Sequence, residues 1–527
     1  MMPSPLKESG VTLTMPMTST RSGLIAFTYR PMLLSQLAAA VPGARVLSGG
    51  ATLIDAVIQD SRQARPGALF VALKGLRVDG HDFAGAAAEK GAAVAGEKVL
   101  ALPGTVPQLL LPETRWALGE LAAELLGRPA RRLRVAGVTG TDGKTTVTHL
   151  TAHLLNACGL AAGYLSTVGQ AGDGAESANA SGKTTLEAPQ VQDALQTMLA
   201  AGKGAAVLEA SSHALVQGRV SACDFDAVAV TNVGRDHLEY HRTWADYLRA
   251  KGRLIELCAS AYRKGVAKTA VLNLADSDSL PYLRGLPIER QVTCAIDAVA
   301  DVSAHDLRAA PNGTTFWLSV GDRRAGARLP MVGRFNVANA LTAAALCRAL
   351  TGADAETLTA GLASFPGVPG RLEQVRLGRP FAVYVDYAHA AGSLSQVLAE
   401  LRQITRGRIL LVFGSTGRSD HDRPGMGRAA AEGADWFVIT TDDPVQEDPA
   451  EIARQVESGV SGRRRGSDYE VEPDREAAIR RALSLARAGD AVLLAGKGHE
   501  QTMITAEGTL PWSDRAAAEA ALRELGY

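Results

Sequence analysis

The segment Gly137–Thr146, which reads GVTGTDGKTT, constrains the fold of this chain more than any other stretch. It follows the apolar run 133–136 and precedes a helical pattern over 147–157. A strand, a glycine-rich turn and a helix form the context that a phosphate-binding loop requires. Gly140 and Gly143 let the backbone curl, so that several N–H groups face one point at a helix N-terminus, where anions are favoured.

Two side chains at the end of this segment carry the predicted chemistry. Lys144 would reach the outer phosphates of a nucleotide, and the Thr145 hydroxyl would hold Mg²⁺. Val138 departs from the general pattern, because it occupies the position of the first glycine. The alternative is an ordinary glycine-rich turn between a strand and a helix. Such a turn does not account for the run GKTT. We therefore expect a phosphate-binding loop that differs from the general pattern at Val138.

Composition argues against several other classes of protein. The chain has 55 basic and 55 acidic residues, whereas nucleic-acid binders usually carry a basic excess. Its five cysteines are scattered without a CxxC pair, which favours reduced thiols in a cytoplasmic protein. The sequence contains no run of 18 apolar residues, so we expect no membrane span.

The length of the chain and its alternating strand-like and helix-like segments predict an α/β protein with three domains. We expect a disordered extension over 1–26, a small N-terminal α/β domain over 27–130, a central P-loop domain with a doubly wound parallel sheet over 131–368, and a C-terminal Rossmann-like α/β domain over 369–527. Residues 128–132 combine one proline with three arginines. They are expected to form an unpacked linker.

Four segments of the central domain give more local expectations. The apolar runs 205–209 and 226–231 are typical of buried parallel strands. Residues 169–182, rich in Gly, Ser, Asn and Asp, are expected to form a long loop. Residues 292–329 are expected to form an antiparallel side sheet.

Three polar side chains near these strands are candidates for chemistry. Glu209 ends an apolar run, and in isolation it would be a structural acid. Beside a phosphate loop in the same sheet it is a candidate Mg²⁺ ligand, because hard cations take oxygen ligands. His237 follows Arg235 and Asp236, and its neighbours make a metal or substrate role worth testing. Lys251 lies on a predicted helix, and its own chemistry favours only an ordinary solvated lysine.

Eight motifs occur in order along the chain: GTDGKTT, EASSHAL, TNVGRDHLEYH with a lysine fourteen residues after His237, GRFNVANAL, PGRLE, VDYAH, DRPGMG and AGKGHE. Together they resemble the Mur ligases, and DSRQARPGALFVALKG followed by DGHDF is similar to the uridine-binding domain of that family. The resemblance covers about residues 55–527. It implies a ligase that uses ATP and Mg²⁺ to add the third residue, a free diamino acid, to UDP-MurNAc-L-Ala-D-Glu through an acyl phosphate.

The resemblance also assigns roles to individual positions. The catalytic residues would be Lys144, Glu209, His237 and Lys251. The ATP site would comprise Gly140, Thr141, Asp142, Gly143, Lys144, Thr145, Thr146, Asn336, Arg371 and Asp386, with Asp142 where the family usually has Asn. The UDP-MurNAc-dipeptide would contact Ser61, Thr184, Thr185, Ser211, Gln217 and Arg219. The metal ligands would be Thr145, Glu209, His237 and Lys251, the last as a carbamate.

The incoming amino acid would contact Arg418, Asp442, Asp443, Gly496 and Glu500. Enzymes of the family that add meso-diaminopimelate carry Asp-Asn-Pro-Arg where this chain reads Asp-Asp-Pro-Val, ending at Val445. Val445 cannot form a charge-assisted bond to the second carboxylate of that substrate, and Asp443 would attract a side-chain ammonium. Both changes favour L-lysine or L-ornithine. In the alternative, Arg418 alone binds the second carboxylate of meso-diaminopimelate, and Val445 is only a packing residue.

Two other functions stay open at this point. One is a related ATP-dependent ligase such as folylpolyglutamate synthetase, against which the uridine-domain segment around Ser61 argues. The other is a non-ligating nucleotide-binding paralogue, which Asp142 and the altered amino-acid pocket would fit; it predicts nucleotide binding without an amide product. A P-loop motor or GTPase would need a guanine-reading motif, for which we see no support. The Mur ligase resemblance further implies a cytoplasmic monomer with small-molecule substrates and no nucleic-acid partner.

Overall fold

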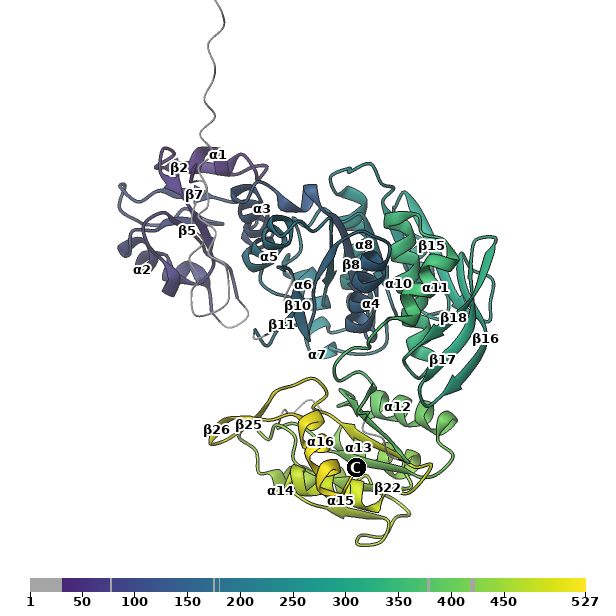
Figure 1. Ribbon diagram of the computed structural model, residues 1–527. Coiled ribbons are helices and arrows are strands. Elements are labelled where there is room, and N and C mark those ends of the chain that lie inside the picture. The colour runs from purple at the N-terminus through teal and green to yellow at the C-terminus, as the bar shows by residue number, and fades with distance from the viewer. Residues whose placement is uncertain (1–30, 76–77, 174–175, 180, 377–379, 418–421) are drawn as a thin grey trace, which may run out of the picture. The chain divides into compact units, whose positions relative to one another are not determined.

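The computed structural model describes residues 31–75, 78–173, 176–179, 181–376, 380–417 and 422–527 (Figure 1). The extension predicted over 1–26 lies outside these ranges, as does Arg418. The chain divides into two compact units, Met1–Arg128 and Pro129–Tyr527. No helix within the described ranges is long and apolar enough to cross a lipid bilayer.

The first unit is a small α/β sheet. Its strand order is β2-β7-β6-β5-β4, and only the β2–β7 pair is antiparallel. The apolar run 68–71 forms one of its inner strands, and an alanine-rich helix follows over 84–89. The elements are β1 (Met32–Leu33), α1 (Leu34–Ala38), β2 (Arg45–Ser48), β3 (Leu53–Ile54), β4 (Ala56–Ile58), β5 (Ala68–Val71), α2 (Ala84–Glu89), β6 (Ala93–Gly96), β7 (Gln108–Leu110) and α3 (Thr114–Leu125).

The second unit begins with an eleven-stranded sheet of order β11-β10-β9-β12-β8-β13-β14-β15-β16-β17-β18. The strands from β9 to β16 in this order are parallel, and the two strands at each end are antiparallel. The strands are β8 (Arg134–Thr139), β9 (Ala162–Leu165), β10 (Gly169–Ala171), β11 (Glu176–Ala178), β12 (Ala205–Glu209), β13 (Ala227–Val230), β14 (Thr269–Asn273), β15 (Arg290–Ile296), β16 (Val302–Ala310), β17 (Gly313–Val320) and β18 (Arg323–Leu329).

Helices cover both faces of this sheet, as a doubly wound fold requires. Ala136 and Val138 of β8 face one apolar cluster with α4 and α10, whereas Val135 faces the other cluster with α5 and α8. The helices are α4 (Lys144–Ala157), α5 (Ala188–Ala200), α6 (Ser212–Val216), α7 (Leu238–His241), α8 (Trp244–Ser260), α9 (Leu280–Arg284), α10 (Arg334–Thr351) and α11 (Ala355–Ala363).

Three local expectations were wrong in whole or in part. Residues 169–182 contain the hairpin β10–β11, because β10 pairs with the edge strand β9 through Gln170 and Leu165. Residues 292–329 include the expected antiparallel strands, β16 to β18, but they do not form a separate sheet, because β15 pairs in parallel with both β14 and β16. The linker predicted at 128–132 is packed: Pro129–Arg132 is a 3₁₀ turn whose Ala130 is buried against the core near α5.

The rest of the second unit is a six-stranded sheet of order β19-β20-β24-β21-β22-β23, parallel except for β19. Its parallel strands alternate with helices, as those of the preceding sheet do, so the predicted α/β class is confirmed. The domain boundaries stay a prediction. The elements are β19 (Glu373–Gln374), β20 (Ala382–Asp386), α12 (Ala391–Ile404), β21 (Ile409–Phe413), α13 (Arg423–Gly433), β22 (Trp436–Ile439), α14 (Pro449–Glu457), β23 (Tyr469–Val471), α15 (Arg475–Leu485), β24 (Ala491–Ala495), the hairpin β25 (Thr502–Thr505) and β26 (Gly508–Pro511), and α16 (Asp514–Glu524).

Candidate active site

The loop between β8 and α4 has the glycine-dependent geometry that its sequence predicts. Gly140 has φ 151° and Gly143 has φ 81°, values that side-chain-bearing residues rarely adopt. A Cβ on Gly140 would lie 1.7 Å from Thr231 Oγ1, and a Cβ on Gly143 would lie 2.2 Å from Asn339 Oδ1. Helix α4 begins at the next residue, Lys144. The loop therefore presents backbone N–H groups at a helix N-terminus.

The end of β13 holds this loop in place. The backbone N–H groups of Thr141 and Asp142 donate to the backbone and side-chain oxygens of Asn232, at 2.9 and 3.0 Å. Thr231 Oγ1 donates to the Asp142 carbonyl at 2.6 Å. Lys144 Nζ donates to the Thr141 carbonyl at 2.8 Å. Thr231 and Asn232 were not singled out from the sequence, although polar residues at the carboxyl end of a parallel strand are a general signal for a site.

Glu209 is 2% exposed and ends β12 beside the loop. Thr145 Oγ1 donates to the carboxylate, lying 3.1 Å from each oxygen. Thr167 donates through its backbone N–H at 2.8 Å and through its hydroxyl at 3.0 Å. All of these donors are neutral, so they orient the carboxylate without cancelling its charge. Such a carboxylate next to a threonine hydroxyl suits a hard divalent cation.

Lys251 is not the solvated lysine that its helix position suggested, because it is 1% exposed. Its Nζ donates to the Gly140 carbonyl at 2.5 Å and lies 4.3 Å from the centre of the Tyr247 ring. Burial lowers the pKa of Lys251 well below its usual value, and the Lys144 ammonium lowers it further. The amine at the back of the phosphate loop is therefore poised to be neutral.

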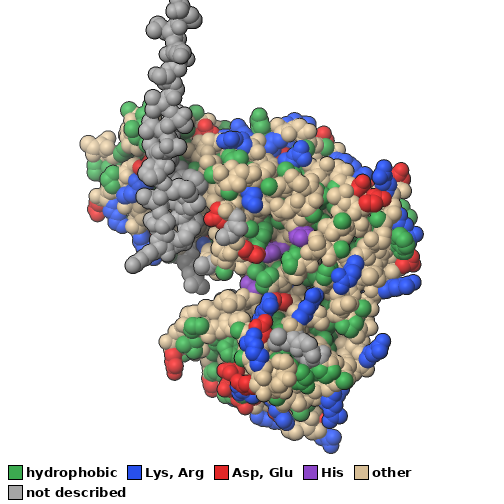
Figure 2. Space-filling view, viewed as in Figure 1, with side chains coloured by type: hydrophobic (Ala, Val, Ile, Leu, Met, Phe, Trp, Pro, Cys, Tyr) green, Lys and Arg blue, Asp and Glu red, His purple; other side chains and the backbone are tan. Residues whose placement is uncertain are grey.

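His237 stands in an aromatic cluster near the same loop. Its side chain is 46% exposed, and its backbone is left-handed with φ 52°, a strained state for a residue with a side chain. The His213 ring lies 5.0 Å from the His237 ring, and the Tyr247 ring lies 6.3 Å from it. Burial lowers the pKa of His213 to about 4, with His237 adding to the effect. Histidine side chains, purple in Figure 2, gather at a hollow of the visible face.

Tyr247 connects these groups but was missed in the sequence. Its hydroxyl lies 3.1 Å from Thr141 Oγ1, so it touches the phosphate loop as well as the Lys251 amine and the His237 ring. Tyr247 lies one helical turn before Lys251. That spacing puts the two residues on one face of α8 and was a usable signal.

Four residues of the second unit that were expected to contact the dipeptide come together, namely Thr185, Ser211, Gln217 and Arg219. Thr185 Oγ1 donates to the Glu209 carbonyl at 2.9 Å and accepts from the Ser211 N–H at 3.0 Å. Arg219 donates to the Thr185 carbonyl at 2.9 Å and to Gln217 Oε1 at 2.7 Å. Thr184 precedes Thr185 in the chain. Ser61 lies in the first unit, where its carbonyl accepts a hydrogen bond from the Lys90 ammonium at 3.1 Å.

A cleft of about 590 Å³ gathers most of the expected ATP contacts. Arg371 is at its wall, with its guanidinium 4.8 Å from the centre of the Tyr387 ring and Nη2 3.5 Å from Thr145 Oγ1. Asp386 accepts the N–H groups of Leu372 and Ala388 at 2.7 and 2.8 Å, and burial raises the pKa of its carboxyl. The expected residues that line the cleft are Asp142, Gly143, Thr146, Asn336, Arg371 and Asp386.

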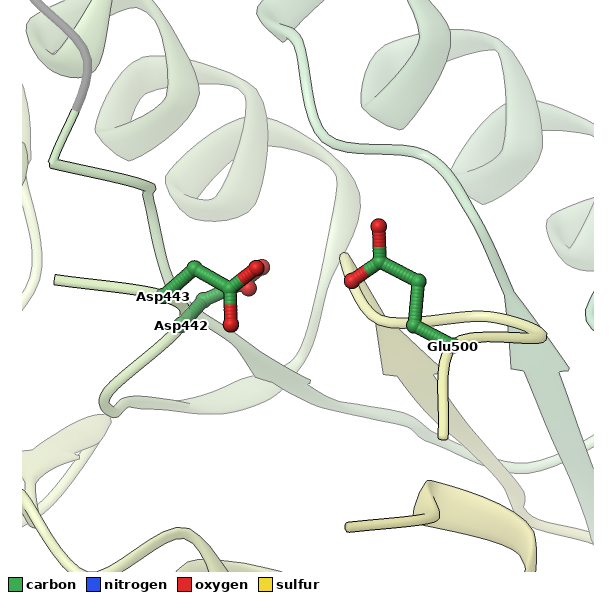
Figure 3. A group of neighbouring side chains, drawn as sticks. All are labelled: Asp442, Asp443 and Glu500. Carbon is green, nitrogen blue, oxygen red and sulfur yellow. The ribbon is translucent and has the colours of Figure 1, made fainter. Parts of the chain in front are cut away.

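Three acids expected to contact the amino acid, Asp442, Asp443 and Glu500, converge in Figure 3. Lys497 Nζ lies among them: it donates to Asp443 at 2.7 Å, pairs with Glu500 and lies 3.9 Å from Asp442. The backbone N–H of Ile504 also donates to Asp443, at 2.8 Å.

Asp442 is the least satisfied member of this acid cluster. Its Oδ2 atom is buried without a hydrogen-bond partner among the described residues, and burial raises the pKa of Asp442 to about 6. Gly496 has φ 109°, and a Cβ there would lie 2.2 Å from the same oxygen. The N–H of Gly417 donates to the Asp443 carbonyl at 2.8 Å, so the chain leading to Arg418 starts beside the cluster; Arg418 itself is outside the described residues.

Comparison with known families gives three matches along the chain. Residues 138–347 match the Mur ligase middle domain. Residues 370–498 match the Mur ligase glutamate ligase domain, and residues 53–123 match the family described as "Mur ligase family, catalytic domain". The first match contains the phosphate-loop glycines Gly140 and Gly143, the second contains Asp442 and Asp443 and ends two residues before Glu500, and the third contains Ser61.

Individual proteins are similar over nearly the whole length. The chain is 41% identical over 487 residues to a UDP-N-acetylmuramyl-tripeptide synthetase of Roseiflexus sp. (strain RS-1), covering 90% of this chain and 95% of that protein. It is 40% identical over 496 residues to a UDP-N-acetylmuramoyl-L-alanyl-D-glutamate–2,6-diaminopimelate ligase of Geobacillus thermodenitrificans, covering 94% and 100%. A solved structure of a ligase with the latter name superposes with a TM-score of 0.68 at 30% identity, covering 94% of this chain and 100% of that one.

Proposed function

Because the chain belongs to the Mur ligase family of ATP-dependent ligases, we propose that it joins a free diamino acid to UDP-MurNAc-L-Ala-D-Glu as the third residue of the peptidoglycan stem. One observation carries the proposal. The Thr145 hydroxyl lies 3.1 Å from both Glu209 oxygens and 3.5 Å from Arg371 Nη2. The phosphate loop, the candidate metal ligand and the nucleotide cleft therefore meet at one atom. Its place of action, under this proposal, is the cytoplasm.

The first step is transfer of the γ-phosphoryl group of ATP to the γ-carboxylate of the D-Glu residue. Little covalent chemistry falls on the protein in such a transfer, so positioning and charge stabilisation dominate. Lys144 would give up its hydrogen bond to the Thr141 carbonyl and reach the outer phosphates of ATP. The N–H groups of the loop would bind the remaining phosphate. The oxygens of Thr145 and Glu209 fit Mg²⁺, which when bound would neutralise charge on the phosphate oxygens.

Lys251 contributes to the same site as a carbamate in this proposal. Its neutral amine adds to carbon dioxide, one proton is released, and the side chain becomes a carboxylate-like anion. Two observations support the step: the side chain is buried at 1% exposure, and its pKa is lowered, so the amine is available as a nucleophile. With Glu209 and the His237 imidazole it would complete the set of metal ligands.

The second step is attack on the acyl phosphate by the α-amine of the incoming amino acid. The tetrahedral intermediate collapses to the amide and releases phosphate. Thr185 and Ser211 would hold the dipeptide, and Arg219 is the nearby cation for its carboxylates. Its guanidinium donates to the Gln217 side chain and lies 3.3 Å from a Glu187 oxygen, so it is already oriented before the substrate arrives.

We favour L-lysine or L-ornithine over meso-diaminopimelate as the added residue. Three carboxylates of the acid cluster face one ammonium, that of Lys497, and this surplus of negative charge suits a substrate side chain that ends in an ammonium. Asp443 acts through its charge, because Lys497 and Ile504 already occupy its Oδ1 atom. Asp442 Oδ2 is the oxygen with spare capacity. Similar proteins carry both general tripeptide-synthetase and diaminopimelate-ligase names, and the two choices predict different products.

The test supplies the purified enzyme with UDP-MurNAc-L-Ala-D-Glu, ATP, Mg²⁺ and, in separate reactions, lysine, ornithine or meso-diaminopimelate. The tripeptide is detected by mass and ADP by a coupled assay, with the Lys144→Ala variant as the inactive control. We expect product with lysine or ornithine. Product with meso-diaminopimelate alone would refute the choice of amino acid. Nucleotide binding without any amide product would identify a non-ligating paralogue, and product only with a folate substrate would identify the related ligase.

A further inference from the structure

Two cysteines of the second unit lie side by side although 189 positions separate them in the chain. Cys158 caps the C-terminal end of α4, and Cys347 lies in the last turns of α10. Their Sγ atoms are 3.6 Å apart, and both residues are free thiols. Nothing in the proposed ligase chemistry uses either of them.

The two thiols have complementary environments. Cys158 is partly exposed, and the hydrogen bond with the Cys347 thiol lowers the pKa of Cys158 to about 7. Cys347 is buried, and the same bond together with burial raises its pKa. Partly exposed, low-pKa cysteines react first with oxidants, and a neighbouring thiol then resolves the product.

The other three cysteines, Cys223, Cys258 and Cys294, are buried. Burial raises the pKa of Cys258 to about 12 and that of Cys294 to about 11. A buried thiol of high pKa is inert. The reactive pair is thus distinguished from the remaining cysteines by position as well as by chemistry.

We propose that Cys158 and Cys347 form an oxidisable dithiol, a modification site that reacts with peroxides and closes to a disulfide. The Cys158 thiolate attacks one peroxide oxygen, the O–O bond breaks, and a sulfenic acid and one water form after proton uptake. The Cys347 sulfur then attacks the sulfenic sulfur, losing its proton and expelling the second water. Two thiols lose two electrons in total, and one hydrogen peroxide is reduced to two waters.

The geometry permits this closure with local movement. A disulfide needs an S–S distance of about 2.05 Å, so the sulfurs must approach by roughly 1.5 Å. Cys158 is the capping residue at the end of α4, and its N–H makes only the last helical hydrogen bond, to the Leu154 carbonyl, so a small shift there leaves the earlier hydrogen bonds of α4 intact.

The bond would connect the far ends of two helices that flank the nucleotide cleft. Helix α4 starts at the phosphate loop, and the first turns of α10 carry Asn336 and Asn339, which line the cleft. Asn339 approaches the loop so closely that a Cβ on Gly143 would collide with it. Oxidation would therefore make α4 and α10 move as one body beneath the nucleotide.

The test treats the native full-length enzyme with hydrogen peroxide and counts thiols before and after. We expect the count to fall from five to three, the intact mass to fall by two hydrogens, and a non-reducing peptide map to join the segments of Cys158 and Cys347. Dithiothreitol should restore all five thiols. A count that stays at five, or a disulfide between other cysteines, would overturn the proposal.

Three variants sharpen the test. Cys347→Ser should leave a sulfenic acid on Cys158 that dimedone labels, because its resolving thiol is gone. Cys158→Ser should protect Cys347 from oxidation, and the matched control Cys223→Ser should still form the disulfide. Dimedone labelling of Cys347 in the Cys158→Ser variant would contradict the assigned order of attack. The wild-type thiol count needs no variant, so the proposal stays falsifiable even if one of these proteins fails to fold.

Discussion

The hydroxyl of Thr145 lies 3.1 Å from each oxygen of the Glu209 carboxylate. The first residue lies in the opening turn of α4, and the second ends β12. The two meet because β12 runs parallel to β8, with Glu209 opposite Val138 just before the phosphate loop. A neutral donor, not a cation, faces the carboxylate there, so the acid keeps its charge for another partner.

Glu209→Gln removes that charge while keeping the shape of the side chain. We expect ligation to fall by about 10²–10³-fold, the usual loss when one preorganised electrostatic group is deleted. Stability should fall by about 1–2 kcal/mol, because the amide NH₂ would face the Thr145 or Thr167 donors. ADP release and urea unfolding measure the two effects. The matched control is Glu356→Gln, which changes an acid in the first turn of α11. Near-normal turnover of Glu209→Gln would show that Glu209 is not a metal ligand.

Lys251→Ala tests the carbamate. The substitution removes a buried side chain that touches Gly140 and Tyr247, and we expect a loss of activity of about 10²-fold or more. Added acetate or formate should restore part of it by supplying a carboxylate in the vacated space. Arg249→Ala, an exposed residue on the same helix, should keep full activity. Full activity of Lys251→Ala without any added acid would contradict the role, as would a ¹³C NMR spectrum of the ¹³CO₂-treated wild type without a carbamate signal.

Much of the fold was readable from local sequence. The strands expected at 205–209 and 226–231 are present as β12, which has those bounds, and as β13, which is one residue shorter at each end. Continuous apolar runs with sharp polar ends mark strands that are buried on both faces. The two turn glycines, Gly140 and Gly143, were readable for the same local reason, since their positive φ excludes most other residues.

The features that the sequence did not predict depend on pairings between residues far apart in the chain. The hairpin β10–β11 exists because β9 offers it an open edge, and no residue within the hairpin encodes that neighbour. Lys497 and Asp443 are 54 positions apart, so no spacing rule joins them. The burial of Lys251 was different: Tyr247, Lys251 and Leu254 follow helical spacing on the buried side of α8, and this periodicity should have placed the lysine in the core.

Asp442 should give stability a measurable dependence on pH. Burial raises its pKa in the folded protein to about 6, above the usual 3.8, so the folded state holds the proton more tightly than the unfolded state. The stabilising effect is complete below about pH 4 and is lost as pH rises through 6. Relative to Asp442→Asn, the wild type should therefore lose up to about 3 kcal/mol across this range.

The measurement is urea unfolding of both proteins between pH 4 and 7.5, with Glu432→Gln, an exposed acid on α13, as the control variant. The informative quantity is the change with pH of the difference in unfolding free energy, because constant packing effects of the substitution cancel in it. A difference that stays flat across this range would show that Asp442 titrates as an ordinary acid.

Asp226 is a residue at which a substitution should change the stability of the protein and leave its catalysis unchanged. Its carboxylate is fully buried and lies 2.6 Å from Lys264 Nζ and 3.0 Å from Lys268 Nζ, while it accepts the Val135 N–H at 2.9 Å. One carboxylate thus compensates two ammonium groups. It sits immediately before β13, at the amino ends of the parallel strands, whereas Thr231 and the phosphate loop are at the carboxyl ends.

Asp226→Asn keeps the shape of the side chain and removes the negative charge that pairs with Lys264 and Lys268, so two buried cations lose their partner. We expect a loss of about 3–5 kcal/mol in the free energy of unfolding, the usual result when one member of a buried ion pair is deleted. Asp224→Asn is the matched control two residues away; its ion pair with the exposed Arg131 should account for less than about 1 kcal/mol. Because the site lies at the opposite edge of the sheet, kcat per folded molecule should stay unchanged in both variants. Urea unfolding and active-site titration measure the two quantities separately. A variant that unfolds like the wild type would mean that Lys264 sheds its proton instead, as its burial-lowered pKa would allow.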